Sequence, residues 1–186
     1  TNLFSGFGGF EGRSLQKGDY LFIDSPQAEL SMAGRSLKSK WIPKYPSAWT
    51  LRVVWGPQDS DFTNKGKRTL AHTLYKVSSQ SDRTGIRLEG AEIQRKNDTA
   101  ESIISEGLIS GSIQVPGDGK PIIILGETVS GGYRKIATVI TADLHLLGQI
   151  KPGDEIQFAA VSLEKAHQAI NEAGRRMNQI STHLNS

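Results

Sequence analysis

The stretch of sequence that decides the fold reads GSIQVPGDGKPIIIL and covers residues 111–125. Residues 111–115 and 121–125 each predict a β-strand, because short runs rich in β-branched residues and bounded by turn residues are typical of strands. Residues 116–119 between them read Pro-Gly-Asp-Gly. This run is typical of a tight turn, since Gly adopts positive φ and Asp bonds the neighbouring backbone. The stretch therefore predicts a β-hairpin.

Similar strand patterns recur on both sides of this hairpin. Gly-Asp pairs at residues 18–19 and 153–154 each precede an alternating apolar run, which is how a chain turns into a strand. The further strands that we expect cover residues 20–23, 51–55, 75–78, 85–90, 135–140 and 156–161. Many short strands separated by turn residues predict a mainly β fold, either a closed barrel or a sandwich.

The end of the chain follows a different period. Apolar residues recur at helical spacing over residues 163–180, and Ser162 is placed to cap the first turn. The apolar stripe must cover the barrel or a partner, and we expect it to cover the barrel. Residues 69–74 could form a short helix or a loop. We therefore expect a β-barrel domain over residues 1–161 and a C-terminal α-helix within residues 162–186.

Length and composition limit the classes of protein to consider. The chain has 186 residues, of which 37% are hydrophobic, and this suits one main globular body. Its apolar runs are far shorter than a membrane span, and we expect a cytoplasmic protein that does not enter a membrane. The absence of cysteine excludes disulfides, thiolate nucleophiles and cysteine zinc sites. The start at Thr1 without an initiator Met leads us to expect a piece of a longer protein.

Basic residues gather in one part of the chain, although the net charge is only +3. Residues 35–68 hold eight Lys and Arg residues against Asp59 and Asp61. We favour a solvated face of a loop region, while a docking surface for an acidic partner or substrate stays open. No nucleic-acid module accompanies these charges, and we expect no specific binding to nucleic acid.

Three charged residues beside a glycine form the first candidate site. Asp82, Arg83 and Arg87 are candidate catalytic residues, because a guanidinium recognises a carboxylate or phosphate and a neighbouring carboxylate can orient it or act as a base. A structural Asp–Arg pair that pins a turn is equally compatible with this pattern.

Two further segments supply candidate substrate-binding residues. The Gln114 amide can both donate to and accept from a urea-like or lactam group, with Pro116 shaping the rim. Gly131 and Gly132 would let backbone amides approach a ligand while Tyr133 supplies a ring and a polar tip. An exposed strand face and a plain tight turn are the alternatives for these two segments.

Several other kinds of site find no support in the sequence. The four His residues lack metal-ligand spacing, and we expect no metal. No nucleophile-elbow pattern is present, and the Gly-rich opening fits neither a phosphate loop nor a dinucleotide fingerprint.

Taken in series, three clusters give the chain a resemblance to the biotin-dependent carboxyltransferase family, which includes the C subunit of 5-oxoprolinase and allophanate hydrolase subunit 2. They are SDRTGIRLEG (residues 81–90), GSIQVPGDGKP (residues 111–121) and GGY (residues 131–133) leading to IATV and Asp143-Leu144. The likeness runs from Gly12 to about Phe158. The loop at residues 126–130 and Arg134, where a Pro often follows the Tyr, depart from the family pattern.

The resemblance implies a cyclophilin-like β-barrel preceded by a further region of comparable size. It also implies a non-ATP-binding component of an ATP-dependent 5-oxoprolinase, which converts 5-oxoproline to glutamate, or of a related urea carboxylase or allophanate hydrolase complex. Proteins like the A and B subunits of such a complex, the latter KipI-like, would be its partners. ATP would bind to one of these partners, and biotin is a possible cofactor. The alternative is a KipA-like regulator that antagonises a histidine-kinase inhibitor. A peptidyl-prolyl isomerase would rest on the fold alone, which does not carry function.

Overall fold

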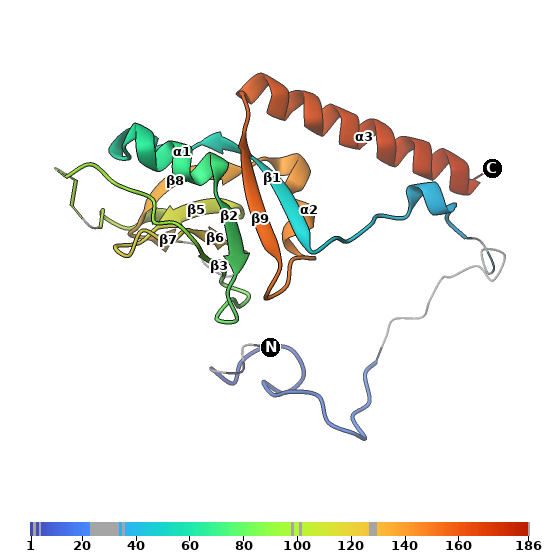
Figure 1. Cartoon of the computed structure of the whole chain (residues 1–186). Helices are drawn as coiled ribbons and strands as arrows, with labels where there is room; N and C mark the ends of the chain where they lie inside the picture. The colour runs from blue at the N-terminus through green and yellow to red at the C-terminus, as the bar shows by residue number, and fades with distance from the viewer. Residues whose placement is uncertain are drawn as a thin grey trace. The chain divides into compact units, whose positions relative to one another are not determined.

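The chain folds into two compact units, Thr1–Ser36 and Leu37–Ser186. The computed structural model describes residues 1, 3, 5–22, 34, 36–97, 99–100, 102–126 and 130–185. The larger unit holds a β-barrel and three α-helices within these residues (Figure 1).

Seven strands form the closed barrel. In their order around it they are β1 (Ala48–Trp55), β8 (Arg134–Val139), β5 (Ser112–Val115), β6 (Ile122–Ile124), β3 (Gly85–Glu89), β2 (Leu74–Val77) and β9 (Glu155–Ala160). Neighbouring strands are antiparallel except for β1 and β9, which pair in parallel and close the barrel. The predicted mainly β fold, a barrel followed by a C-terminal helix, is confirmed.

The hairpin that opened the sequence argument joins β5 to β6. Ile113 lies opposite Ile123, and the turn is closed by a hydrogen bond of 3.1 Å from the amide of Gly119 to the carbonyl of Pro116. Gly119 has a φ of 72°, which favours glycine, and Asp118 accepts a bond of 3.0 Å from the Lys120 amide. The turn chemistry expected from the sequence is therefore the chemistry observed.

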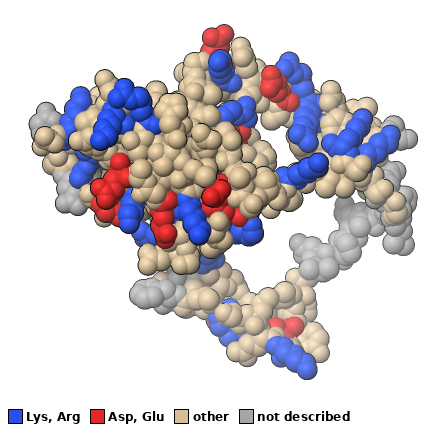
Figure 2. Space-filling model, viewed as in Figure 1, with Lys and Arg blue, Asp and Glu red and all other residues tan. Residues whose placement is uncertain are grey.

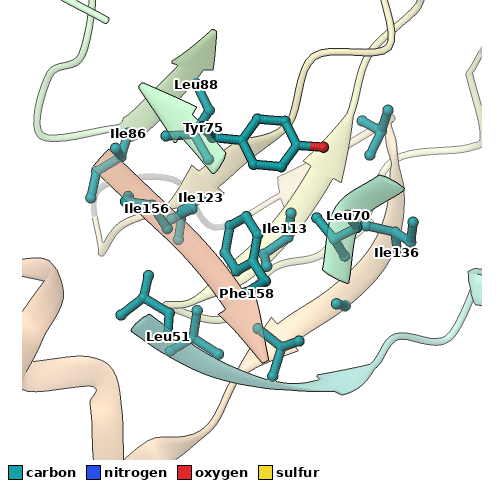
Figure 3. Packing of buried hydrophobic residues seen from close by; sticks show 14 of the residues in the cluster. Leu51, Leu70, Tyr75, Ile86, Leu88, Ile113, Ile123, Ile136, Ile156 and Phe158 are labelled. Atoms are coloured by element: carbon teal, nitrogen blue, oxygen red, sulfur yellow. The ribbon is translucent and has the colours of Figure 1, made fainter. Parts of the chain in front are cut away.

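Alternate residues of the strands point inward and fill the barrel with apolar side chains (Figure 3). Leu51 and Phe158 are almost fully buried, and the Phe158 ring packs against Tyr75 with ring centroids 5.9 Å apart. Burial raises the pKa of Tyr75 to about 12. The interior is a packed core, so a ligand site must lie on the outside of the barrel.

The parallel pairing of β1 and β9 runs from Ala48 opposite Glu155 to Val53 opposite Ala160. At its start the buried carboxylate of Asp154 accepts a hydrogen bond of 3.0 Å from the Trp49 indole. The same carboxylate accepts bonds from the backbone amide and ammonium group of Lys151, at 3.1 and 2.5 Å. These contacts tie β9 to β1 at the point where the barrel closes.

Two longer helices pack on the barrel. The helix α1 (Asn64–His72) begins at an N-cap where the Thr63 hydroxyl accepts from the Gly66 amide at 2.9 Å, and it buries Leu70. Residues 69–74 were predicted as either a short helix or a loop. The helix α1 starts before this range and ends within it. The helix α3 (Leu163–Asn185) confirms the C-terminal helix and continues past residue 180.

The helix α3 covers the barrel only near its start. Ser162 caps it by accepting from the Lys165 amide at 3.3 Å, and Ala166 and Ala169 are buried against Ile140. Met177, farther along, is 63% exposed. The expected covering of the barrel therefore holds for the first turns of the apolar stripe and is wrong for the rest.

Short elements complete the larger unit. These are the 3-10 turns η2 (Ser39–Trp41), η3 (Asp59–Asp61) and η4 (Thr141–Asp143), the helix α2 (Leu144–Leu147), and a two-stranded sheet of β4 (Glu106–Gly107) and β7 (Ser130–Gly131). This small sheet was not predicted, because strands of two residues are too short to show an alternating pattern in the sequence. No helix within the described residues is long and apolar enough to cross a membrane.

In the smaller unit an ion pair between Arg13 and Asp19 closes the segment that follows the glycine-rich residues 6–12. Two hydrogen bonds of 2.8 Å join the guanidinium to the carboxylate. The strand expected over residues 20–23 is wrong where it is described, since Tyr20 to Phe22 belong to no strand and Ile23 lies outside the described residues. An alternating run forms a strand only when a neighbouring strand supplies its hydrogen-bond partners.

The buried Asp154 predicts an acid-sensitive barrel closure. Burial opposes its ionisation, but the bonds from Lys151 and Trp49 outweigh this and lower its pKa. A lowered pKa stabilises the fold above the unfolded value of about 3.9, and the stabilisation is lost as pH falls below it. We expect Asp154→Asn to lower the free energy of unfolding by about 1–3 kcal/mol at pH 7 and by less at pH 3.

Urea denaturation at the two pH values measures this effect. Glu155→Gln, an exposed carboxylate at the next position, is the matched control and should change little at either pH. An equal loss for Asp154→Asn at both values would contradict the prediction.

Candidate functional site

The outer face of one barrel wall carries the polar residues singled out in the sequence. Arg87 on β3 lies opposite Ile122 on β6, which lies opposite Gln114 on β5, which lies opposite Lys135 on β8. The residues on either side of Arg87 and of Gln114 belong to the barrel core. Because side chains alternate along a strand, Arg87 and Gln114 point outward. Residues from separate segments therefore meet in one row across four strands.

A cavity of about 300 Å³ lies at this wall, and we call it the Tyr133 cavity. It is lined by Ser78, Gln80, Arg87, Leu88, Glu89, Pro116, Asp118, Lys120, Pro121, Ile122 and Tyr133. The turn at residues 116–121 forms one side, and β3 with the segment that follows β2 forms another. Its volume is at the lower end of the range for small-molecule sites.

Three of the predicted site residues, Arg87, Pro116 and Tyr133, line this cavity together. They come from three separate parts of the sequence, and Tyr133 is 41% exposed. Arg87 and Lys120 supply positive charge to the lining, and Glu89 and Asp118 supply negative charge. Such a lining can bind a small polar molecule that carries both an anionic group and hydrogen-bonding groups.

Gln114 lies behind the cavity rather than in its lining. Its side chain is on the outer face of β5, yet the residue is only 4% exposed. The amide nitrogen donates to the backbone carbonyl of Tyr133 at 3.1 Å. Gln114 therefore holds the backbone that carries Tyr133, and its predicted direct contact with a substrate stays a prediction.

Packing inside the protein accounts for both glycines before Tyr133. A Cβ on Gly131 would lie 2.8 Å from the Gln114 amide nitrogen and 3.0 Å from a methyl carbon of Leu108. A Cβ on Gly132 would lie 3.0 Å from the carbonyl oxygen of Ile103. Neither glycine has a positive φ. These positions need glycine for close approach, while their predicted role in ligand binding is untested.

Asp82 and Arg83 lie in the turn before β3 and are not part of the cavity lining. The Asp82 carboxylate accepts from the amides of Thr84 and Gly85, at 2.8 and 3.1 Å. Burial opposes its ionisation, but these bonds and the charge of Arg87 outweigh that effect and lower its pKa. The Asp82 carboxylate thus pins its own turn through backbone amides, whereas the alternative was an Asp–Arg pair. The predicted catalytic roles of Asp82 and Arg83 stay predictions.

A buried cation beside Gln114 escaped the sequence argument. The Lys135 side chain is 7% exposed and pairs with Glu106 of β4 at 2.7 Å. Gln58 completes the group, because its amide donates to the same carboxylate oxygen at 2.6 Å and accepts from the Lys135 backbone amide at 3.1 Å. The bond from Lys135, supported by that from Gln58, lowers the pKa of Glu106. The pair attaches the small sheet to the barrel wall.

Arg134, a departure from the family pattern, is also buried and also paired. It is 7% exposed, and its guanidinium donates to Asp61 at 2.7 Å and to the carbonyl of Ala100. A proline at this position could make neither contact. No sequence signal reveals Lys135 or Arg134 as buried, because a basic residue in a strand is normally solvated.

Within the described residues, no three His, Asp or Glu side chains gather in a way that would hold a metal ion. The predicted absence of a metal stays a prediction. The Tyr133 cavity offers a guanidinium, an ammonium group, two carboxylates, a hydroxyl and a phenol, which together suit a small polar molecule with an anionic group and an amide.

The sequence and the fold both have relatives among known proteins. Residues 1–160 match the family model described as carboxyltransferase domain, subdomain A and B. The C subunit of 5-oxoprolinase from Escherichia coli is 33% identical over all of this chain, and a putative urea carboxylase of Emericella nidulans is 35% identical over 94% of it. The chain spans 58% of the first relative and 15% of the second. The crystal structure of the Kluyveromyces lactis urea amidolyase matches 94% of this chain and 12% of that one, with a TM-score of 0.78 and 26% identity.

The close approach of Gly131 to Gln114 can be tested by stability. Gly131→Ala should lower the free energy of unfolding by about 1–3 kcal/mol, because the new methyl group meets the Gln114 amide. The loss should shrink by at least ~0.5 kcal/mol in a Gln114→Ala background, since the two positions are in contact. Urea denaturation of the four proteins in this cycle measures both quantities.

Gly107→Ala is the matched control. It lies on the partner strand of the same small sheet, and a Cβ there would meet nothing within 4 Å. Equal losses at Gly107 and Gly131, or additive effects in the cycle, would show that contact with Gln114 is not the reason for the glycine.

Proposed function

The chain belongs to the carboxyltransferase domain family, and on this premise we propose that it is a component of an ATP-dependent complex that hydrolyses or carboxylates a small amide. Support comes from the likeness to the C subunit of 5-oxoprolinase and to a putative urea carboxylase. The chain spans only part of each relative's length, and we therefore propose the activity for a larger protein or complex that contains this domain. Its proposed partners are proteins like the A and B subunits of such a complex.

The Tyr133 cavity is the proposed substrate site. The observation that carries this proposal is the convergence of Arg87, Pro116 and Tyr133 on one cavity of small-molecule size, although they lie far apart in the sequence. Residues that only pinned their own turns would have no reason to line a common cavity.

The lining favours an amide that also carries a carboxylate. Arg87 and Lys120 are the cations that can bind an anionic group, and the Arg87 guanidinium offers a planar fork for a carboxylate. The hydroxyl of Ser78 and the phenol of Tyr133 can bond an amide oxygen or nitrogen. The names of the relatives suggest two amide substrates, 5-oxoproline and urea. 5-Oxoproline has both an amide and a carboxylate, whereas urea has no carboxylate.

The steps that this chain performs are binding and orientation. Arg87 holds the carboxylate, Tyr133 closes one side of the substrate, and Gln114 keeps Tyr133 in place through its backbone. ATP chemistry is proposed to lie on a partner protein of the complex. Biotin, if the complex uses it, would supply a carboxyl group, and the cations Arg87 and Lys120 fit a carboxylated group.

The proposal predicts a selective loss in the reassembled complex. Arg87→Gln should lower kcat/KM for 5-oxoproline by roughly 30-fold to 1,000-fold, because a charge-assisted pair with the substrate carboxylate is removed. A steady-state assay of glutamate formation measures this change. Lys76→Gln, an exposed cation on β2 outside the cavity, is the control and should leave the rate unchanged.

Arg83→Gln gives a second comparison, since both arginines were candidates but only Arg87 lines the cavity. We expect it to lower kcat/KM much less than Arg87→Gln does. Unchanged turnover in Arg87→Gln, or equal losses for both arginines, would remove the Tyr133 cavity as the substrate site.

A further inference from the structure

A second cavity lies on another part of the barrel surface, and we call it the α1 groove. It has a volume of about 540 Å³ and is lined by Thr50, Trp55, Lys67, Arg68, Ala71, His72, Gln157, Phe158, Ala159 and Ala160. These residues come from α1 and from the paired strands β1 and β9. The groove shares no lining residue with the Tyr133 cavity. It is therefore a separate candidate site.

The charge of the α1 groove is one-sided. Its lining includes Lys67, Arg68 and His72 but no carboxylate. Figure 2 shows Lys and Arg side chains gathered over α1, at the upper left of the view. A cavity lined by one sign of charge concentrates ligands of the opposite sign.

The basic residues of the groove differ in their partners. Lys67 forms an ion pair with Asp59, and its ammonium group lies 5.6 Å from the centroid of the Trp55 ring. Arg68 and His72 are exposed and lie one helical turn apart on α1. Within the part of the chain that the structure describes, neither Arg68 nor His72 has a salt bridge. The Arg68 guanidinium is thus available to a ligand.

The floor of the groove suits a flat molecule. Thr50 and Gln157 lie opposite each other in the parallel pairing of β1 and β9, and both are exposed. Ala159 supplies a small side chain on the same outer face of β9, two residues beyond Gln157. Trp55 adds an indole ring that is 39% exposed. An aromatic ring, small side chains and two neutral polar groups beside a free guanidinium are what a planar organic anion needs.

We propose that the α1 groove binds a small organic anion with a planar body, with Arg68 holding the anionic group and Trp55 packing against the ring. The site does not depend on the proposed function, because it uses other residues on other strands. It gives a role to two of the eight basic residues between positions 35 and 68, since Lys67 and Arg68 line this cavity.

The experiment uses benzoate and phenyl phosphate as probes, with benzyl alcohol as the uncharged comparison. Binding to the whole chain is followed through the indole N–H signal of Trp55 in two-dimensional NMR, assigned with Trp55→Phe. We expect both anions to bind saturably at 150 mM salt, and benzyl alcohol to bind at least about tenfold more weakly. A response to benzoate alone or to phenyl phosphate alone would define which anionic group Arg68 takes and would support the site.

Arg68→Gln should weaken the binding of both anions by about tenfold while leaving benzyl alcohol unchanged. Lys65→Gln removes an exposed cation from the same helix that does not line the groove, and it should leave the affinity unchanged. Linear, non-saturating shifts would overturn the proposal. So would equal weakening by Arg68→Gln and Lys65→Gln, because that result indicates diffuse attraction to α1 instead of a site.

Discussion

The parallel pairing of β1 with β9 is the constraint on which the rest of the structure depends. Ala48 and Glu155 meet across more than half of the chain, and every other neighbouring pair in the barrel is antiparallel. Without this pairing both strands would be open edges, which are prone to pairing with other chains. The Asp154 carboxylate, bonded to Trp49 and Lys151, holds the two strands together where closure begins. Closing so long a loop costs chain entropy. The Asp154 contacts at the start of the pairing help to offset this cost.

Closure of the barrel determines where a ligand can bind. The interior is filled by packed apolar side chains such as Leu51, Tyr75 and Phe158. Both candidate sites therefore lie on outer faces, one beside β3, β5 and β6 and one beside β1 and β9. In each case a segment outside the barrel supplies the second wall. The hairpin turn at residues 116–121 does this for the Tyr133 cavity, and α1 does it for the α1 groove.

Buried polar contacts fix the arrangement of the segments on the Tyr133 side of the barrel. Gln114, Lys135 and Arg134 would be solvated on an ordinary strand face, but here each is covered and each has a partner. Buried groups of this kind would strongly destabilise the fold if they were unpaired. Because each is paired, the segments that cover this wall can adopt only one arrangement. The Gly131 backbone can lie against Gln114 only because it has no side chain. These contacts fix the backbone that carries Tyr133, which lines the same cavity as Arg87.

The amino-acid sequence alone determined the local elements. The hairpin at residues 111–125, most of the barrel strands and the C-terminal helix follow from periodicity and turn chemistry, which act between near neighbours. Periodicity wrongly predicted a strand at residues 20–22, where the alternating run has no partner strand. It also could not predict that the later part of α3 would not cover the barrel. Among the candidate residues, Arg87, Pro116 and Tyr133 line one cavity and Asp82 and Arg83 do not, a difference that the sequence could not predict. Only the tertiary structure decided which residues line a cavity, that Gln114 supports Tyr133, and that Arg68 and Trp55 line one groove. These relations join segments far apart in the chain, and they exist only because barrel closure brings those segments together.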